Sequence, residues 1–245
     1  MSGQSVLGRS VRPLDWEKFT SGRFVYIGDL APDGLLVGRI LRSPHAHARL
    51  LSIDTSRARR MPGVHAVITA GDFPDGARYI HDGAADRSPL AVDTVRFVGQ
   101  EVAAVAADTA EQAQAALDAI EVSYAPLPAS FTIDRALEEG APTLHERPTK
   151  LANIALRMVR NWGDMVVARA ASRLSVAGRY WFPPQTHVCM ETNSTVALWK
   201  DGTLHMWTGT QAPFFVAKEM AQLLKLEQEQ VILHEVGIGG AFGSK

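Results

Sequence analysis

The residues most suggestive of chemistry are the glycines of one short segment. Residues 237–243 read Gly-Ile-Gly-Gly-Ala-Phe-Gly and directly follow an apolar run. Such a loop either adopts positive φ angles or lets another group approach the backbone closely, because glycine has no Cβ. Phe242 within it would suit stacking on a flat ligand. The pattern alone leaves two interpretations open, a structural turn and a ligand-contact loop.

Two nucleotide-binding motifs can be tested against this loop by their spacing. Counted from Gly237, the dinucleotide fingerprint needs a third glycine where Phe242 stands. The phosphate-binding loop needs a lysine directly after its last glycine, but Ser244 follows Gly243. The sequence therefore argues against a nucleotide site here.

A second candidate is Gln211, in the segment Thr208-Gly209-Thr210-Gln211-Ala212-Pro213. A helix is expected to begin at Pro213, and the free backbone N–H groups at its start would favour an anionic or oxo partner. The Gln211 amide could add two donors and an acceptor at the same place. A plain surface or capping role is the alternative.

Three possible metal ligands, His187, Cys189 and Glu191, alternate along an expected strand. Residues on one face of one strand lie too far apart to converge on a single ion, so we predict a buried polar network that orients neighbouring loops. His45 and His47 lack a carboxylate or cysteine neighbour, and we expect a turn there. No Ser/His/Asp constellation can be recognised.

Composition narrows the classes of function. The 245 residues are 46% hydrophobic and 21% charged, with a formal net charge of −1, which argues against nucleic-acid binding. Cys189 is the only cysteine, so any iron–sulfur cluster would have to sit on another chain. No run approaches the ~18 apolar residues of a membrane span. We expect a soluble, cytoplasmic protein without a membrane span.

The first group of elements predicts an α/β layer domain. Its helix should begin with a capping box formed by Thr109 and Gln112. The apolar stripe of that helix is Ala113, Ala116, Leu117 and Ile120. The expected strands of this domain are 35–41, 64–69, 101–107 and 121–124.

The second group of elements predicts another sheet. Asp201-Gly202 is a strong hairpin signal between two of its strands. A helix is expected over 213–226, with an apolar face of Phe214, Phe215, Met220, Leu223 and Leu224. The expected strands are 175–182, 186–200, 203–208 and 231–236. The predicted boundaries are an arm at 1–19, a domain at 20–130, and a linker plus part of a second domain at 131–245.

Several blocks of the chain together resemble one known family, the aldehyde oxidases and xanthine dehydrogenases. The first half is similar to the a/b hammerhead domain of that family, and the second to the opening part of its molybdenum-cofactor-binding domain. The implied fold class is α/β, a hammerhead layer domain followed by part of a mixed α/β domain. The blocks are Gly8–Val11, Gly28–Leu30, Arg42–Ala48, Pro62–Val64, Val95–Ala103, Val122–Pro128, Gln185–Glu191, Thr210–Pro213 and Gly239–Gly243.

The resemblance implies roles for particular residues. Gln211 is similar to the glutamine whose side chain hydrogen-bonds the apical oxygen of molybdenum. The loop of Gly239, Gly240, Ala241, Phe242 and Gly243 is similar to the one whose backbone lies against the oxygen ligands of the metal and against the pterin. Gln211 and Phe242 would then neighbour those oxygen ligands, and no protein side chain would bind the metal directly. Ala241 and Ser244 stand where the family usually has glycine, so this loop is bulkier.

The implied activity is oxidative hydroxylation of an N-heterocycle or aldehyde, with water as the oxygen source. The implied cofactor is molybdenum-molybdopterin, in its cytosine dinucleotide form if the source is bacterial. The implied partners are an iron–sulfur subunit with [2Fe-2S] clusters, an FAD subunit and a chain carrying the C-terminal molybdenum domain. That last chain should supply the general-base glutamate, so no catalytic residue is expected here. The alternatives are a truncated, non-catalytic assembly module and a carbon monoxide dehydrogenase-like large subunit.

Overall fold

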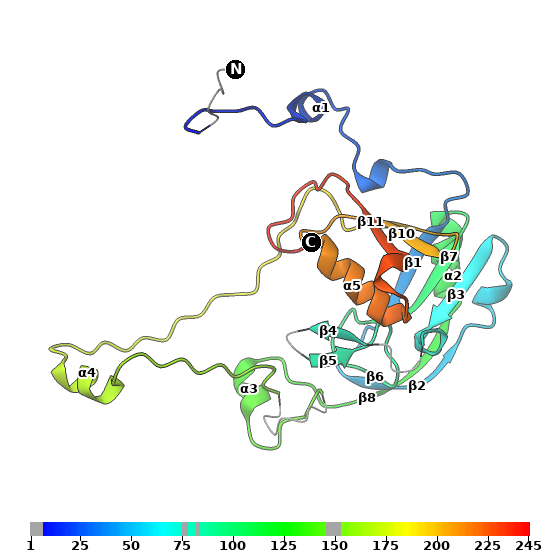
Figure 1. Cartoon of the computed structure of the whole chain (residues 1–245). Helices are drawn as coiled ribbons and strands as arrows, with labels where there is room; N and C mark the ends of the chain where they lie inside the picture. Colours follow the sequence, from blue (N-terminus) through cyan, green and yellow to red (C-terminus); the bar gives the residue numbers. More distant parts are fainter. Residues whose placement is uncertain (1–6, 75–77, 82–83, 146–152) are drawn as a thin grey trace. The chain divides into compact units, whose positions relative to one another are not determined.

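The computed structural model describes residues 7–74, 78–81, 84–145 and 153–245. Sequence-based expectations for residues 1–6 and 146–152 fall outside that range. The chain divides into two compact units, one formed by Met1–Leu35 with His187–Lys245 and the other by Leu36–Thr186. The first unit therefore joins the two ends of the sequence, and its amino-terminal part contains the short helix α1 (Trp16–Thr20) (Figure 1).

The 36–186 unit is built on small antiparallel sheets. Its strand orders are β1-β7-β3, β6-β2-β8 and β4-β5. The bounds of these strands are β1 (Val37–Arg42), β2 (Ala48–Asp54), β3 (Val64–Thr69), β4 (Tyr79–His81), β5 (Ala84–Arg87), β6 (Thr94–Val95), β7 (Glu101–Ala107) and β8 (Glu121–Pro126). The expected strands at 64–69 and 101–107 are confirmed, and the mixed α/β class holds.

Helix α2 (Ala110–Asp118) covers the β1-β7-β3 sheet. The predicted capping box is present, because Thr109 Oγ1 accepts from the Gln112 N–H at 3.2 Å and Gln112 Oε1 accepts from the Thr109 N–H at 3.1 Å. The predicted apolar stripe is also buried, against Val67, Val105 and other side chains of the sheet. Local sequence signals therefore correctly placed this helix and its buried face.

The strand–helix–strand succession does not form one sheet. Strand β7 lies at the centre of its sheet, whereas β8 pairs with β2 in the other. Successive residues of β7 face both ways, so Val102 packs with Ala48 and Val95 of the second sheet. Strand β7 thus contributes to the packing of both the β1-β7-β3 and the β6-β2-β8 sheets.

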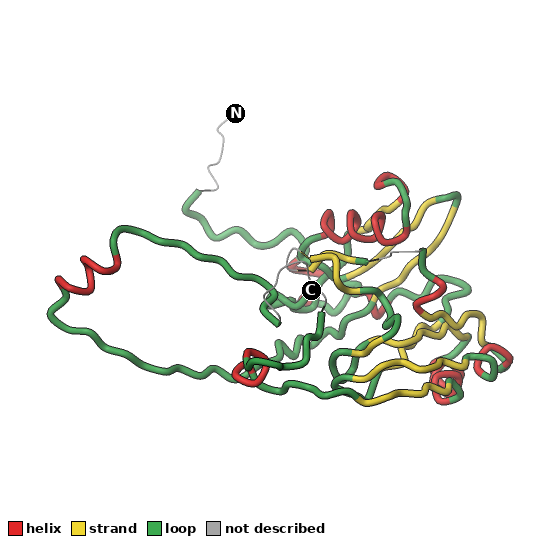
Figure 2. Tube along the Cα trace, turned by 90° about the horizontal axis from the view of Figure 1, so that it is seen from below, coloured by secondary structure: helices red, strands yellow, loops and turns green. Residues whose placement is uncertain are grey.

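Residues 153–186 form a long, mostly irregular segment at the end of this unit. It carries α4 (Met165–Ala171) and comes after α3 (Ile133–Leu137) (Figure 2). The expected strand at 175–182 is wrong, since these residues form neither a helix nor a strand. An isolated apolar run has no strand to pair with, and pairing is what makes a strand. Across the described ranges, no helix is long and apolar enough to cross a membrane.

The other unit has a mixed sheet with strand order β11-β10-β9. Its strands are β9 (Thr195–Lys200), β10 (Thr203–Thr208) and β11 (Val231–His234). Asp201 and Gly202 both take positive φ angles, 50° and 77°, as the predicted tight hairpin requires. Helix α5 (Pro213–Leu224) connects β10 to β11, which run parallel.

Two sequence-based expectations for this unit need correction. The strand expected over 186–200 begins only at Thr195, and the residues before it are irregular, with Val188 at a φ of 46°. Leu223 of the predicted apolar face of α5 is buried, and Met220 and Leu224 pack against the core beside buried Ala217 and Ala221. The prediction is wrong at Phe214 and Phe215, which are 85% and 56% exposed. The first turn of α5 thus leaves its aromatic side chains without cover within the described chain.

Candidate functional site

The structure brings the two best candidate segments together. Gln211 Oε1 accepts a hydrogen bond from the backbone N–H of Gly243 at 3.1 Å. The backbone N–H of Gln211 donates in turn to the carbonyl oxygen of Lys245, also at 3.1 Å. The loop that follows β10 and the loop that follows β11 are therefore joined through both side chain and backbone. This agrees with the parallel pairing of the two strands, whose carboxyl ends lie at the same edge of the sheet.

This contact also sets the orientation of the Gln211 amide. Because Oε1 accepts from Gly243, the amide must present Nε2, with its two donors, in the other direction. No described residue accepts a hydrogen bond from Nε2, and the residue is exposed. The adjoining start of α5 has no side-chain cap at Ala212. The site thus offers uncommitted N–H donors, which suit an oxygen-rich or anionic ligand.

The glycine-rich loop takes unusual backbone angles. Gly240, Phe242 and Gly243 have φ angles of 102°, 49° and 93°. The loop closes on itself because the Ser244 backbone N–H and side-chain hydroxyl both donate to the Ala241 carbonyl, each at 2.8 Å. Phe242 is held at a positive φ and is 76% exposed. A bulky side chain at such an angle is strained, and this strain is typical of loops shaped for a ligand.

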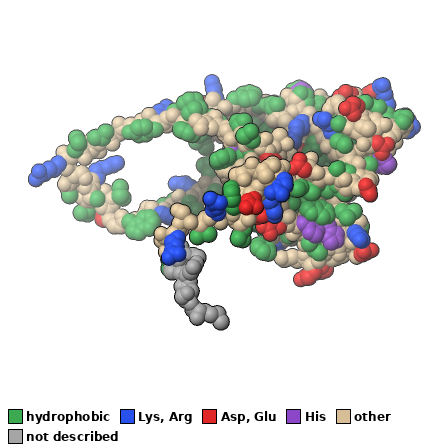
Figure 3. Space-filling view, turned by 90° about the horizontal axis from the view of Figure 1, so that it is seen from above, with side chains coloured by type: hydrophobic (Ala, Val, Ile, Leu, Met, Phe, Trp, Pro, Cys, Tyr) green, Lys and Arg blue, Asp and Glu red, His purple; other side chains and the backbone are tan. Residues whose placement is uncertain are grey.

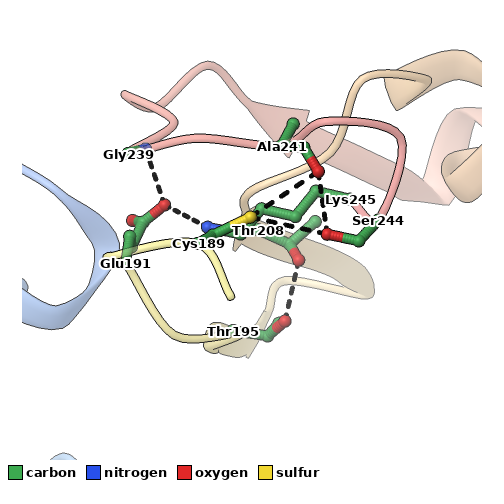
Figure 4. Close-up of polar contacts among 8 residues, drawn as sticks. All are labelled: Cys189, Glu191, Thr195, Thr208, Gly239, Ala241, Ser244 and Lys245. Carbon is green, nitrogen blue, oxygen red and sulfur yellow. Dashed lines mark hydrogen bonds and ion pairs between the residues drawn. The ribbon is translucent and has the colours of Figure 1, made fainter. Parts of the chain in front are cut away.

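Glu191 supports the loop from beneath (Figure 4). Its Oε2 accepts from the Gly239 N–H at 2.8 Å and forms an ion pair with Lys245 Nζ. The side chains of Glu191 and Lys245 are only 12% and 2% exposed. This buried pair was not foreseen from the sequence. Glu191 lies in a stretch of mixed polar and apolar residues that gives no sign of a buried ion pair, and its partner is 54 positions away.

The electrostatics of Glu191 favour its charged form. Burial raises the pKa of this carboxyl, but hydrogen bonds from Lys245 and from the Gly239 N–H outweigh it. The charge of Lys245 and the Ile27 backbone also act to lower it, so the pKa lies below its ordinary value. Glu191 is therefore a fixed anion at neutral pH.

His187 and Cys189 also turn toward the loop. Cys189 Sγ lies 3.6 Å from both the Ala241 carbonyl oxygen and Ser244 Oγ (Figure 4). A Cβ added at Gly243 would lie 3.9 Å from His187 Nε2. Within the described ranges, no group of three or more His, Cys, Asp or Glu residues could hold a metal ion. The buried polar network expected of this segment forms only at Cys189 and Glu191, because His187 is exposed and makes no hydrogen bond to a described residue. The strand expected to carry the three residues is absent.

A hollow opens beside these loops. Its volume is about 500 Å³, and it lies between the end of β10, the start of α5 and the residues after β11. Thr210 and Pro213 line it on one side, and Val236 and Ile238 on another. The hollow borders the Gln211 segment through Thr210 and Pro213, but Gln211 and Gly239–Gly243 do not line it.

His45 and His47, in the other unit, make local contacts. The His45 N–H donates to Ser43 Oγ at 3.0 Å, and His47 Nδ1 lies 2.6 Å from the Pro128 carbonyl oxygen. The segment is a turn between β1 and β2, as expected.

Solved structures similar to this chain define the class of protein. Quinoline 2-oxidoreductase from Pseudomonas putida 86 matches 96% of the chain with a TM-score of 0.86 and 32% identity, over 31% of its own chain. The aldehyde oxidoreductase of Desulfovibrio gigas matches 94% with a TM-score of 0.84 and 27% identity, over 26% of its chain. The fold is that of the amino-terminal region of molybdenum hydroxylase large subunits.

Sequence comparison gives the family. Residues 21–128 match the family model "aldehyde oxidase and xanthine dehydrogenase, a/b hammerhead domain", and residues 144–245 match "molybdopterin cofactor-binding domain". The chain belongs to the aldehyde oxidase and xanthine dehydrogenase family of molybdenum-dependent oxidoreductases.

Curated relatives agree with this assignment. A probable xanthine dehydrogenase component of Bacillus subtilis is 36% identical over 96% of the chain, and the nicotinate dehydrogenase large molybdopterin subunit of Eubacterium barkeri is 32% identical over 98%. The chain spans 31% and 56% of the length of these two relatives.

Proposed function

We propose that this chain forms the cofactor-facing amino-terminal part of a molybdenum hydroxylase. The activity would be oxidative hydroxylation of an N-heterocycle or aldehyde with water as the oxygen source. One observation carries the proposal. The Gly243 N–H donates to Gln211 Oε1, so the amide donors of Gln211 point away from the loop. The names of the relatives, which include nicotinate dehydrogenase and aldehyde oxidase, support these two substrate classes.

The residues present fit a molybdopterin cofactor. Gln211 would donate to an oxygen of the metal centre, and the loop Gly239–Gly243 would lie against the group with little side-chain bulk in the way. Phe242, exposed beside them, would border the substrate path. When bound, the cofactor supplies the redox centre at which the substrate is oxidised. The chain itself binds, orients and shields it.

Glu191 does not suit the role of general base. Glu191 is the carboxylate nearest the loop in the contacts described, and both Lys245 and Gly239 engage its Oε2. A carboxylate held this way, with a lowered pKa, makes a poor base. We therefore place the base in the polypeptide that corresponds to the remaining length of the relatives.

An exposed apolar segment supports assembly with that polypeptide. We call residues 156–182 the apolar strap, and Figure 3 shows hydrophobic side chains along extended chain on the face drawn. Its large apolar side chains are at least 62% exposed, and such a concentration marks an interaction surface. They are Leu156, Met158, Val159, Trp162, Met165, Val166, Val167, Leu174, Val176, Tyr180, Trp181 and Phe182.

Further partners follow from the electron transfer that the reaction needs. The chain has one cysteine, so [2Fe-2S] clusters would lie on a separate iron–sulfur subunit and FAD on another. The cofactor would be the cytosine dinucleotide form if the source is bacterial.

Metal analysis of the assembled enzyme tests this function. The chain is produced together with the polypeptide that completes the relatives' subunit and with the electron-transfer subunits. The expected result is molybdenum and released pterin in the assembly, with a clear loss of both for Gln211→Ala and no change for Gln114→Ala on α2. An assembly that forms fully but holds no molybdenum would contradict the proposal and favour a non-catalytic assembly module.

A further inference from the structure

We propose that Glu191 and Lys245 are a positioning pair that fixes the glycine-rich loop relative to Gln211. The inference rests on the proposed function, because the loop matters through the cofactor it would hold. Neither side chain is expected to touch the reacting atoms. Their role would be to hold the backbone that does face the cofactor.

Glu191 engages both polar groups of Gly239. Its backbone N–H donates to the Gly239 carbonyl at 3.3 Å, and its Oε2 accepts from the Gly239 N–H at 2.8 Å. The approach is so close that a Cβ built on Gly239 would lie 2.6 Å from Glu191 Cβ. Gly239, the first residue of the loop, is therefore held in position and orientation by the side chain and the backbone of one residue, Glu191.

Lys245 connects this anchor to Gln211. Its ammonium group pairs with Glu191, while its backbone carbonyl accepts from the Gln211 N–H at 3.1 Å. Gln211 in turn accepts from Gly243. One closed set of contacts thus joins the segment after residue 187, the loop after β10 and the glycine-rich loop.

The burial of the pair favours a positioning role over a stabilising one. Removing two charges from water costs much of what their attraction returns, so a buried pair adds little net stability. The cost is visible at Glu191 Oε1, which is buried with no hydrogen bond of ordinary geometry to any described residue. What the pair provides is a defined geometry, because a charged group tolerates few other arrangements in a buried place.

The test uses the assembled enzyme and three variants: Glu191→Leu, Lys245→Met, and the two combined. Each single variant leaves one buried charge without its partner and should unfold at a lower temperature. The double variant has no unpaired charge, so its melting temperature should recover. If the pair positions the loop, hydrogen exchange at the Gly239 and Gly243 amides should be faster than in the unaltered protein in both single variants. It should remain faster in the double variant. The molybdenum content should also stay low, with a loss of affinity of about 10–100-fold, as for other groups that orient a metal site.

The contrary result is clear. If the double variant regains molybdenum content and slow exchange together with its melting temperature, the pair is only structural and the inference fails. Neutralising the exposed pair Arg135–Glu138, whose side chains are 73% and 54% exposed, is the control and should change neither readout. Absence of molybdenum from the unaltered assembly would defeat the proposed function instead, while the exchange measurement would still test the pair.

Discussion

The side chain of Gln211 and the backbone of Gly243 meet at 3.1 Å although 32 positions separate them in the sequence. This bond does two things at once. It fastens the glycine-rich loop to the start of α5, and it leaves the amide donors of Gln211 facing away from the protein backbone. An exposed surface glutamine would have no reason to adopt one amide orientation over the other.

The Gln211→Glu substitution tests the donor role directly. Glutamate keeps an acceptor for the Gly243 N–H but replaces the Nε2 donors with an oxygen, so the loop should fold normally. A second anionic oxygen facing an oxygen ligand should lower the hydroxylase activity of the assembled enzyme by about 10–100-fold. Steady-state rates per molybdenum atom measure this effect, and unchanged rates would mean that Gln211 does not donate to the cofactor.

Gly239→Ala should destabilise the unit formed by the two ends of the chain. The new Cβ would meet Glu191 Cβ at 2.6 Å, too short a distance to relax without moving backbone. We expect a loss of about 1–3 kcal/mol in the free energy of unfolding, the usual cost of overpacking. Gly28→Ala, in the same unit, is the matched control, because a Cβ there would meet nothing within 4 Å. Equal melting temperatures for the two variants would argue against the close approach.

The Glu191 contacts should weaken in acid. Because the pKa of Glu191 is lowered in the folded protein, the stability it contributes is fully present above the ordinary value of 4.5 and is lost as the pH falls through the lowered pKa. The Gly239 amide should therefore be protected, with exchange slower than its intrinsic rate, above pH 4.5. It should lose that protection only below pH 4.5. Amide exchange against pH measures this, with Glu191→Gln as the control that should lack the transition. A transition above 4.5 would show that burial dominates over Lys245.

The apolar strap should control assembly. Trp162 and Trp181 are 79% and 82% exposed, and buried tryptophans contribute strongly to interfaces. Replacing both with serine should reduce co-purification with the completing polypeptide without lowering the melting temperature of the 36–186 unit. Phe131→Ser, at a residue 81% exposed outside the strap, should leave co-purification unchanged. If the tryptophan variant assembles normally, the strap is not the interface.

Thr109→Ala should destabilise α2 by about 1 kcal/mol, the typical cost of losing an N-cap side chain. The Gln112 N–H would lose its acceptor at the helix start. Thr109→Ser keeps the hydroxyl and serves as the control. Thermal unfolding of the two variants measures the difference, and identical curves would mean that the capping bond adds nothing.

The sequence by itself determined the features that depend on near neighbours. The capping box at Thr109, the strand at 101–107 and the Asp201-Gly202 turn all follow from residue types a few positions apart. Gln211 and the glycine-rich loop were also identified there as candidates, although as two separate signals.

Only the tertiary structure decided where strands form and which distant residues meet. The apolar run at 175–182 reads as a strand, but it has no pairing partner in the described chain, and no local pattern reveals that. Glu191 and Lys245 carry no signal of their pairing, because side chains 54 positions apart meet only when the fold brings their segments to one edge of a sheet. Long-range contacts depend on the packing of the whole unit, whereas caps and turns depend on a few neighbouring backbone groups.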